Sequence, residues 1–253
     1  NSTRCLDVAG ASTSSGTNVQ VYTDNNTAAQ RWKFARQPGT YKPGPSSTGV
    51  RPGITLTNQG ATTVTTNGAI YENINFTGLV KVAASDVTFL NCRFSGPSTY
   101  TSGVGLIGNS SWDDADQAQA KRLLLEDCTL DAANPSNFTN GFEGHDVTMR
   151  RCKILNVVDG IDVKNHHNGY KDGPVDVYVE ACYIDELAFF SPEPLQSDQK
   201  THNDGVQIMG GSNINFTGNW ITGMLGTAGS YDPSIPPPAG GQANAAFMIS
   251  PTS

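Results

Sequence analysis

Six segments of the chain share one pattern of apolar and polar positions, in which an alternating strand ends in a small residue followed by an apolar one. The segments are residues 70–76, 87–94, 123–130, 147–154, 177–184 and 214–221. Their aligned positions 74, 92, 128, 152, 182 and 219 are 18, 36, 24, 30 and 37 residues apart. Self-similarity of this kind is typical of a solenoid whose minimal coil of about 18 to 24 residues carries loop insertions. Helical repeats would need an apolar period of 3.6 residues, so the pattern predicts an all-β solenoid of parallel strands.

The composition agrees with many short strands joined by tight turns, since 27 of 253 residues are Gly, 14 are Pro and only 15% are charged. The 16 basic and 23 acidic side chains give a net charge of −7, which argues against binding nucleic acid or an anionic membrane. No apolar run approaches the ~18 residues that a membrane span needs. The chain opens at Asn1 without an apolar leader, so we expect a secreted protein whose export signal has been removed.

Four of the five cysteines occupy the same position in four successive repeats: Cys92, Cys128, Cys152 and Cys182. A parallel stack brings neighbouring coils within about 5 Å of each other, so these cysteines are predicted to form a column inside the core. Small, polarizable thiols that fill one corner of the core are favoured over disulfides between adjacent coils, which the geometry would also allow.

Residues 1–35 carry a different set of motifs. In chain order these are Cys5-Leu6-Asp7-Val8, Gly16-Thr17-Asn18-Val19-Gln20-Val21-Tyr22 and Gln30-Arg31-Trp32. Together they resemble one repeat of the ricin-type β-trefoil lectins, including the Gln-x-Trp signature of that family. The resemblance implies that sugar is bound by a carboxylate, an aromatic ring and two amides, which suit a pyranose: Asp7, Tyr22, Asn25 and Gln30. Only one repeat is present where a trefoil has three, and the second cysteine expected near Thr23-Asp24 is absent.

The rest of the chain divides into two parts. Pro, Gly and Ser dominate residues 36–53, which predicts a linker between the lectin-like segment and a solenoid over 54–253. Residues 246–250 predict one more strand, with no capping element after it. An uncapped coil exposes strand edges, so we expect a natural protein that extends beyond both ends, with the solenoid truncated on its C-terminal side.

After each strand of the repeat the chain continues with a glycine and another alternating strand. The positions around these glycines form a second column of the solenoid, and this column is polar. Asn140, Asp159 and Asp204 stand immediately before the glycine in three coils, which predicts a strip of polar side chains one coil apart. Alternation sends apolar residues of these strands inward and polar ones outward, namely Lys81, Glu143, Asp162, Lys164 and Gln207. Long insertions at 183–203 and 164–175 flank the strip on opposite edges, which predicts a groove.

With these features, residues 50 to 250 resemble the right-handed parallel β-helices of the pectin-lyase-like superfamily. The resemblance implies a single-stranded right-handed parallel β-helix that cleaves, epimerises or binds polysaccharide in a groove over one sheet. Such proteins are often secreted by bacteria and often carry lectin-like appendages. The motif pattern of the polygalacturonases is not met, and neither is the signature of the pectate lyases. The resemblance therefore implies a polysaccharide partner but does not identify the reaction.

The candidate catalytic residues lie on or beside the strip: Glu143, Asp159, Asp162, Lys164, His202 and Asp204. Two carboxylates about 5 Å apart raise one pKa, as the acid and nucleophile of a glycosidase require. Asp159 with Asp204, or Glu143 with Asp162, would form such a pair. A lyase instead needs a base, for which Lys164 and His202 are candidates, and a cation beside the uronate carboxylate. Asp159, Asp162 and Asp204 are the candidate calcium ligands.

Three functions stay open. A polysaccharide lyase or uronate-processing enzyme is placed first, ahead of a glycoside hydrolase with paired carboxylates. The third is a surface protein whose groove holds glycan without turnover. Gln207 and His166 are candidate sugar ligands in the groove. A zinc site of His166, His202 and Asp204 is a weaker alternative, and each Asp-Gly pair is also ordinary turn chemistry.

Overall fold

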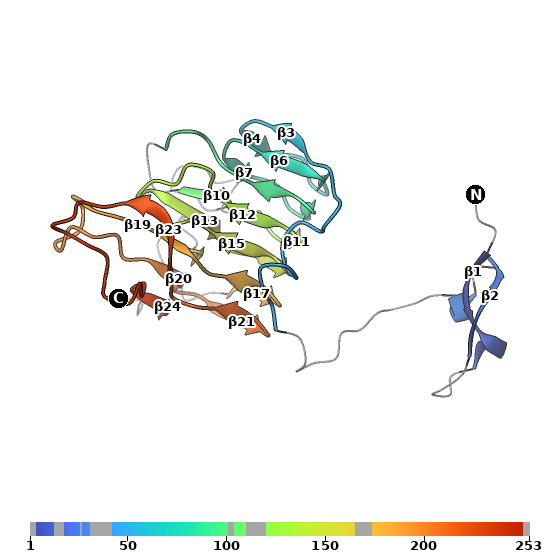
Figure 1. Cartoon of the computed structure of the whole chain (residues 1–253). Helices are drawn as coiled ribbons and strands as arrows, with labels where there is room; N and C mark the ends of the chain where they lie inside the picture. Colours follow the sequence, from blue (N-terminus) through green and yellow to red (C-terminus); the bar gives the residue numbers. More distant parts are fainter. Residues whose placement is uncertain are drawn as a thin grey trace. The chain divides into compact units, whose positions relative to one another are not determined.

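The computed structural model describes residues 4–12, 18–25, 27–30, 42–100, 104–109, 120–164 and 174–249. The chain forms two compact units, residues 1–40 and residues 41–253. In the first unit β1 (Arg4–Val8) pairs antiparallel with β2 (Val19–Thr23), and the 3-10 turns are η1 (Ala9–Ala11) and η2 (Ala28–Gln30). The second unit is a stack of β-coils (Figure 1). The described residues include no helix long and apolar enough to cross a membrane.

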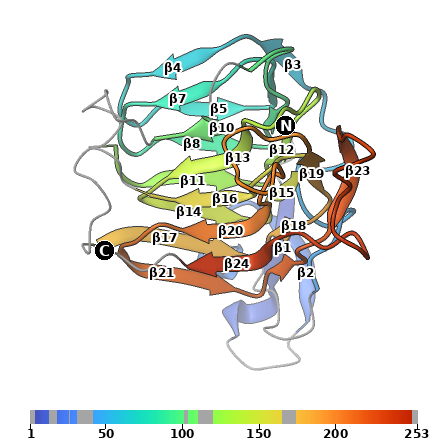
Figure 2. The ribbon, with the colours of Figure 1, turned by 90° about the vertical axis from the view of Figure 1, so that its left-hand side faces the viewer.

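Three parallel sheets run along the stack, and successive coils add strands to each of them (Figure 2). Sheet A contains β5 (Ile70–Glu72), β8 (Thr88–Leu90), β11 (Leu123–Glu126), β14 (Val147–Arg150), β17 (Pro174–Glu180) and β21 (Ser212–Thr217). Sheet B contains β3 (Thr57–Gln59), β6 (Ile74–Phe76), β9 (Arg93–Phe94), β12 (Thr129–Asp131), β15 (Lys153–Leu155), β18 (Tyr183–Ile184) and β22 (Trp220–Ile221). Sheet C contains β4 (Thr62–Val64), β7 (Val80–Val82), β10 (Val104–Gly108), β13 (Thr139–Gly144), β16 (Ile161–Val163), β20 (Asp204–Ile208) and β24 (Ala245–Ile249). The predicted all-β solenoid of parallel strands is confirmed.

The loops between sheets B and C carry one additional element. Within the predicted insertion 183–203, β19 (Leu187–Phe190) forms a parallel pair with β23 (Leu225–Ser230) from the following coil. This pair holds the insertion beside the edge of sheet C, where the strands of that sheet begin. The second predicted insertion, 164–175, falls largely outside the described residues.

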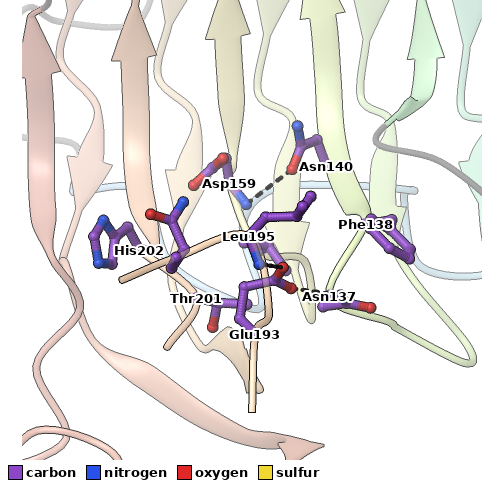
Figure 3. A pocket seen from close by; sticks show the side chains of 10 residues that line it. Asn137, Phe138, Asn140, Asp159, Glu193, Leu195, Thr201 and His202 are labelled. Carbon is purple, nitrogen blue, oxygen red and sulfur yellow. Dashed lines mark hydrogen bonds between the residues drawn. The ribbon is translucent and has the colours of Figure 1, made fainter. Parts of the chain in front are cut away.

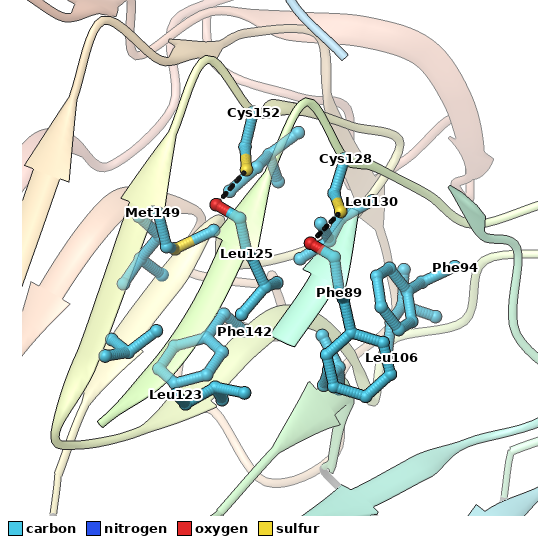
Figure 4. Close-up of a cluster of buried hydrophobic side chains, with 14 of the residues drawn as sticks. Phe89, Phe94, Leu106, Leu123, Leu125, Cys128, Leu130, Phe142, Met149 and Cys152 are labelled. Atoms are coloured by element: carbon cyan, nitrogen blue, oxygen red, sulfur yellow. Dashed lines mark hydrogen bonds between the residues drawn. The ribbon is translucent and has the colours of Figure 1, made fainter. Parts of the chain in front are cut away.

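The cysteine column lies where each coil turns from sheet A into sheet B. The residue before each cysteine has a positive φ, namely Asn91 (50°), Asp127 (54°), Arg151 (50°) and Ala181 (53°). Repetition of this left-handed conformation places each cysteine over the preceding one and keeps the coils in register. All four thiols are free and buried, as predicted. Each donates to a backbone carbonyl of the preceding coil; for example, Cys152 Sγ lies 3.4 Å from the oxygen of Leu125 (Figure 4).

The first coils pack around aromatic rings. Phe76 and Phe94 are stacked with their centroids 5.2 Å apart, and Tyr71 stacks on Phe89 at 5.0 Å. The three phenylalanines are fully buried. Offset and edge-to-face contacts of this kind add to the stabilisation from apolar burial, so the core is continuous from the first coils onward.

Residues 42–53, which the composition assigned to a linker, lie along the outside of the β-helix. The Gly49 N–H donates to the carbonyl of Arg151 at 2.7 Å, and the Val50 N–H donates to Thr129 Oγ1 at 3.0 Å. At one end Lys42 places its ammonium 3.5 Å from the centroid of the Trp220 ring. The segment therefore crosses several coils and joins the compact unit instead of spanning a gap.

Candidate functional site

Asn140, Asp159 and Asp204 stack in adjacent coils at the start of their sheet C strands. The Asp159 N–H donates to Asn140 Oδ1 at 3.4 Å, and the Asp204 N–H donates to Asp159 Oδ1 at 2.8 Å. The glycine that follows each of them allows this close approach. A Cβ on Gly141 would lie 2.3 Å from the Gly160 carbonyl oxygen, so a larger residue does not fit there. The predicted register of the strip is present.

Exposure separates the members of the strip. Asp204 is only 1% exposed, and its Oδ1 accepts from Asn244 Nδ2 at 2.9 Å. Asn140 and Asp159 are partly exposed. Asp204 was predicted as a catalytic residue that touches the ligand. Instead, its side chain turns toward Asn244 in the next coil and is covered. It can influence the site only through its charge, which lies near Asp159.

A pocket of about 180 Å³ opens over the start of β13 and β16 (Figure 3). Its floor comes from the residues that precede these two strands, and its other wall comes from the insertion after β19. The lining residues are Asn137, Phe138, Asn140, Val158, Asp159, Glu193, Leu195, Gln196, Thr201 and His202. Three amides, a hydroxyl, a phenylalanine ring, two aliphatic side chains and three ionisable groups make up this lining, a composition suited to a saccharide.

Asp159 is the less buried of the two acidic residues that line this pocket. Burial raises its pKa well above the usual range, and the charges of Asp204 and Asp162 raise it further, although the backbone N–H of Asp204 opposes them. Glu193 also lines the pocket but is 5% exposed, and it accepts from the Asn137 amide and from the Leu195 N–H. The pocket therefore offers one carboxyl group that tends to hold its proton.

His202 supplies a basic group at the same pocket. Its side chain is 45% exposed, and its Nε2 lies 3.0 Å from Asp198 Oδ1. Figure 3 shows the His202 ring and the Asp159 carboxyl group on the same side of the pocket. The bond to Asp198 orients the ring, as a carboxylate partner does for a histidine that moves protons.

A second cluster of predicted residues lies on the outer face of sheet C. Glu143 and Asp162 are direct neighbours on β13 and β16, and Lys164 Nζ lies 3.2 Å from Glu143 Oε1 and 2.5 Å from Asp162 Oδ2. The predicted pairing of the two carboxylates is therefore present. All three side chains are largely covered, with 11%, 3% and 14% exposure for Glu143, Asp162 and Lys164. The prediction of an open polar face does not hold at this place.

The electrostatics of this ion cluster do not suit a base. Burial raises the pKa of Glu143 and of Asp162, and Lys164 opposes both shifts. Although burial opposes it, the charges of Asp162 and Glu143 raise the pKa of Lys164. Lys164 is therefore held as an ammonium. One oxygen of each carboxylate, Glu143 Oε2 and Asp162 Oδ1, is buried without a hydrogen-bond partner among the described residues.

The three predicted calcium ligands face different partners. Asp162 binds Lys164, Asp204 binds Asn244, and Asp159 accepts from the backbone of Asp204. Within the described ranges no group of three or more His, Cys, Asp and Glu side chains is placed to hold a metal ion. The described residues do not fit a calcium cage, and calcium dependence stays a prediction. The zinc alternative needs His166, which lies outside the described residues.

The predicted sugar ligands of the first unit come together in part. Asp7 accepts from Gln20 Nε2 and Gln30 Nε2, both at 3.1 Å, and Gln30 Oε1 accepts from the Asn25 N–H at 2.9 Å. Asp7 is 6% exposed, whereas Tyr22 is 51% exposed. Asp7 therefore positions the two glutamines, and the Tyr22 ring is open to solvent. On the β-helix, Gln207 lies beside Asp162 in the neighbouring coil and is partly buried.

Several residues of the pocket were not predicted as site residues. Phe138 and Asn137 come from the turn before β13, and Glu193, Leu195 and Thr201 come from the insertion. The insertion itself was a signal, since its length predicted one wall of the groove. Which of its side chains face the pocket depends on the β19–β23 pair, which has no counterpart in the repeat pattern.

Two models of protein families match the chain. One, described as a right handed beta helix region, matches residues 51–229. The other, described as ricin-type beta-trefoil lectin domain-like, matches residues 1–70. Neither the curated proteins nor the solved structures contain a significant match. Both resemblances drawn from the residue patterns are confirmed, and together a β-helix and a lectin-like segment suggest carbohydrate binding or processing.

Proposed function

Because the chain belongs to the right-handed β-helix family, we propose that it is a secreted protein that processes a uronate-containing polysaccharide by β-elimination at the Asp159 pocket. One observation carries the proposal. The pocket is lined by one partly exposed acidic residue, Asp159, whose carboxyl group has a raised pKa, together with one histidine. β-Elimination requires a neutralised uronate carboxylate and a base, and these two groups match those requirements.

In the proposed reaction Asp159, in its protonated form, donates a hydrogen bond to the uronate carboxylate, and the Asn140 amide donates beside it. This neutralisation acidifies the proton α to the carboxylate. His202 accepts that proton, the electrons of the C–H bond form a carbon–carbon double bond, and the bond to the glycosidic oxygen breaks. The departing oxygen takes a proton from His202 or from water, so the products are one unsaturated and one saturated chain end.

The glycoside hydrolase alternative needs two carboxyl groups on opposite sides of the bond that breaks, roughly 5 to 9.5 Å apart. Near the pocket, Asp204 is buried and bound to Asn244, and Glu193 is buried and bound to Asn137. Glu143 and Asp162 form a close pair, but both bind Lys164 and both are covered. No second open carboxylate therefore faces Asp159 among the described residues, which favours elimination over hydrolysis.

The test is incubation of the full chain with a panel of polyuronates and neutral polysaccharides, with and without a chelator. We expect products that absorb in the ultraviolet as unsaturated uronates. New reducing ends without this absorbance would replace the proposal by hydrolysis, and binding without any product would replace it by glycan binding alone. Loss of activity with the chelator would contradict neutralisation by Asp159 and would support the predicted calcium dependence in its place.

Variants separate the two roles in the pocket. Asp159→Asn keeps a hydrogen-bond donor and an oxygen for the Asp204 N–H, so it should retain a substantial part of the activity, whereas Asp159→Ala should lose it. His202→Ala should lower kcat by about 100-fold or more, the usual contribution of a general base. Ser197→Ala is the matched control, since Ser197 is an exposed residue of the same insertion that does not line the pocket. A complete loss with Asp159→Asn would contradict the protonated role of Asp159.

A further inference from the structure

A second depression, of about 230 Å³, lies on the outer face of sheet A. It is formed by β11, β14 and β17 and by Arg122 and Asp146, the residues immediately before β11 and β14. Six of its lining residues define its chemistry: Arg122, Leu124, Thr148, Arg150, Asp176 and Tyr178. None of them lines the Asp159 pocket, which opens where the strands of sheet C begin.

The floor of this depression is a row of side chains in register. Leu124 lies opposite Thr148, and Thr148 lies opposite Tyr178, on neighbouring parallel strands. Adjacent strands are about 4.8 Å apart, so the apolar atoms of Leu124 and Thr148 and the Tyr178 ring form a row over two strand spacings. All three side chains are partly exposed, whereas Leu125 and Met149, which point to the other face, are fully buried.

The two guanidinium groups beside the row are each paired with a carboxylate. Arg122 makes two bonds to Asp86, at 2.6 and 2.7 Å, and Arg150 binds Glu180 at 3.0 Å. Exposed pairs of this kind contribute little to stability, but they cancel the charge of each guanidinium. A phosphate or a uronate would have to displace a carboxylate to bind here. The arrangement instead provides N–H donors and carboxylate acceptors to an uncharged ligand.

Tyr178 is held in a defined position, and its hydroxyl group can still donate one hydrogen bond. Asn213 Nδ2 donates to the Tyr178 hydroxyl oxygen at 2.8 Å and also donates to Asp176 Oδ1. Because the hydroxyl accepts from Asn213, its own hydrogen is directed elsewhere. The ring therefore offers an apolar surface in a fixed position, and the hydroxyl hydrogen offers a donor beside it. Sugar sites use an aromatic residue in this way.

From these features we propose that the sheet A depression is a further glycan-binding site, which takes an uncharged saccharide unit. The unit lies along the row with its C–H surface against Leu124, Thr148 and the Tyr178 ring. Its hydroxyls bond to the Tyr178 hydroxyl and to the paired groups of Arg122 and Arg150. The site does not depend on the proposed elimination reaction, because it lies on another sheet and recognises neutral sugar.

The experiment measures binding and not turnover. The full chain carries Asp7→Ala and Gln30→Ala, which remove the predicted lectin-like site, and His202→Ala, which stops the proposed reaction. Neutral cello-, xylo-, manno- and galacto-oligosaccharides of six units are titrated by calorimetry. At least one of them should bind. Tyr178→Ala should then weaken its affinity by at least tenfold, and Thr148→Arg, which fills the depression, should abolish binding.

Thr88→Arg is the matched control, since Thr88 lies in the same row beside Leu124 but outside the depression. It should bind as the parent chain does, and circular dichroism confirms the fold of every variant. The proposal is overturned if none of the four oligosaccharides binds, or if Thr148→Arg binds as well as Thr88→Arg. Failure of the elimination assay leaves these results unaffected.

Discussion

Replacement of Lys164 by methionine tests the electrostatics of the ion cluster on sheet C. Methionine keeps the length and much of the apolar stem of lysine but removes the ammonium that both Glu143 and Asp162 bind. The two carboxylates are neighbours on adjacent strands and are largely buried. The variant therefore leaves two negative charges side by side, with no cation between them.

The distances set the magnitude of the loss. At an effective dielectric constant of about 20, opposite charges separated by the 3.2 Å between Lys164 Nζ and Glu143 Oε1 interact by about 5 kcal/mol before desolvation is counted. Removal of one partner from a buried ion pair costs about 3–5 kcal/mol in measured cases. We expect Lys164→Met to lower the free energy of unfolding by about 3–5 kcal/mol at pH 8.

The loss should shrink at lower pH. Glu143 and Asp162 already have raised pKa values because they are buried. A carboxyl group with a raised pKa binds its proton more tightly in the folded state, so its contribution to stability falls as pH rises from its ordinary pKa through the folded value. Without Lys164 both pKa values rise further. The variant therefore regains stability as pH falls, because the pair takes up protons.

The assay is urea denaturation followed by circular dichroism at pH 8 and pH 5, with Lys81→Met as the control. Lys81 is an exposed residue of the same sheet, two strands from Glu143. Adding Glu143→Gln and Asp162→Asn to the methionine variant should restore much of the lost stability. A cost below about 1 kcal/mol at pH 8, the value typical of exposed pairs, with no change at pH 5, would refute the reasoning.

Three further predictions follow from the strip and the core. Activity should fall as pH rises through the raised pKa of Asp159, because the protonated form is the working one, and the pH–rate profile of Asp159→Asn should lack this alkaline fall. Cys152 should not react with a thiol reagent in the folded chain, and Cys152→Ala should lower the free energy of unfolding by about 1–3 kcal/mol in denaturation experiments. Gly141→Ala should cost about 3 kcal/mol or prevent folding, because the new Cβ would lie 2.3 Å from the Gly160 oxygen, whereas Gly60→Ala, with no atom within 4 Å, should be tolerated on thermal melting.

The repeat predicted the fold because one local conformation recurs in every coil. A residue with positive φ stands before Cys92, Cys128, Cys152 and Cys182 alike, so the strands on either side superimpose and the cysteines stack. A periodic sequence pattern predicts a periodic structure of this kind. Residues 42–53 have no such period. Their attachment depends on backbone donors at Gly49 and Val50, which composition cannot reveal.

The register of the site was predictable from sequence, but the exposure of its residues was not. The glycines after Asn140, Asp159 and Asp204 allow one stacking arrangement, and the sequence shows them directly. Burial of Asp204 depends on Asn244, a residue 40 positions later in the chain. Alternation likewise places Glu143 and Asp162 outward from the core, but it carries no information about what covers an outward face.

The role of Asp159 is decided by a competition that only the structure displays. The N–H of Asp204 donates to its carboxylate at 2.8 Å, and a bond of this kind by itself favours the charged form and a nucleophile or a base. Burial and the nearby charges of Asp204 and Asp162 act in the opposite direction and prevail. If Asn244→Ala opened Asp204 to water, the buried charge beside Asp159 would be better screened and the pKa of Asp159 would move down. The alkaline fall in activity should then begin at a lower pH, although Asn244 does not line the pocket. An unchanged pH profile in this variant would show that Asp204 does not control the protonation of Asp159.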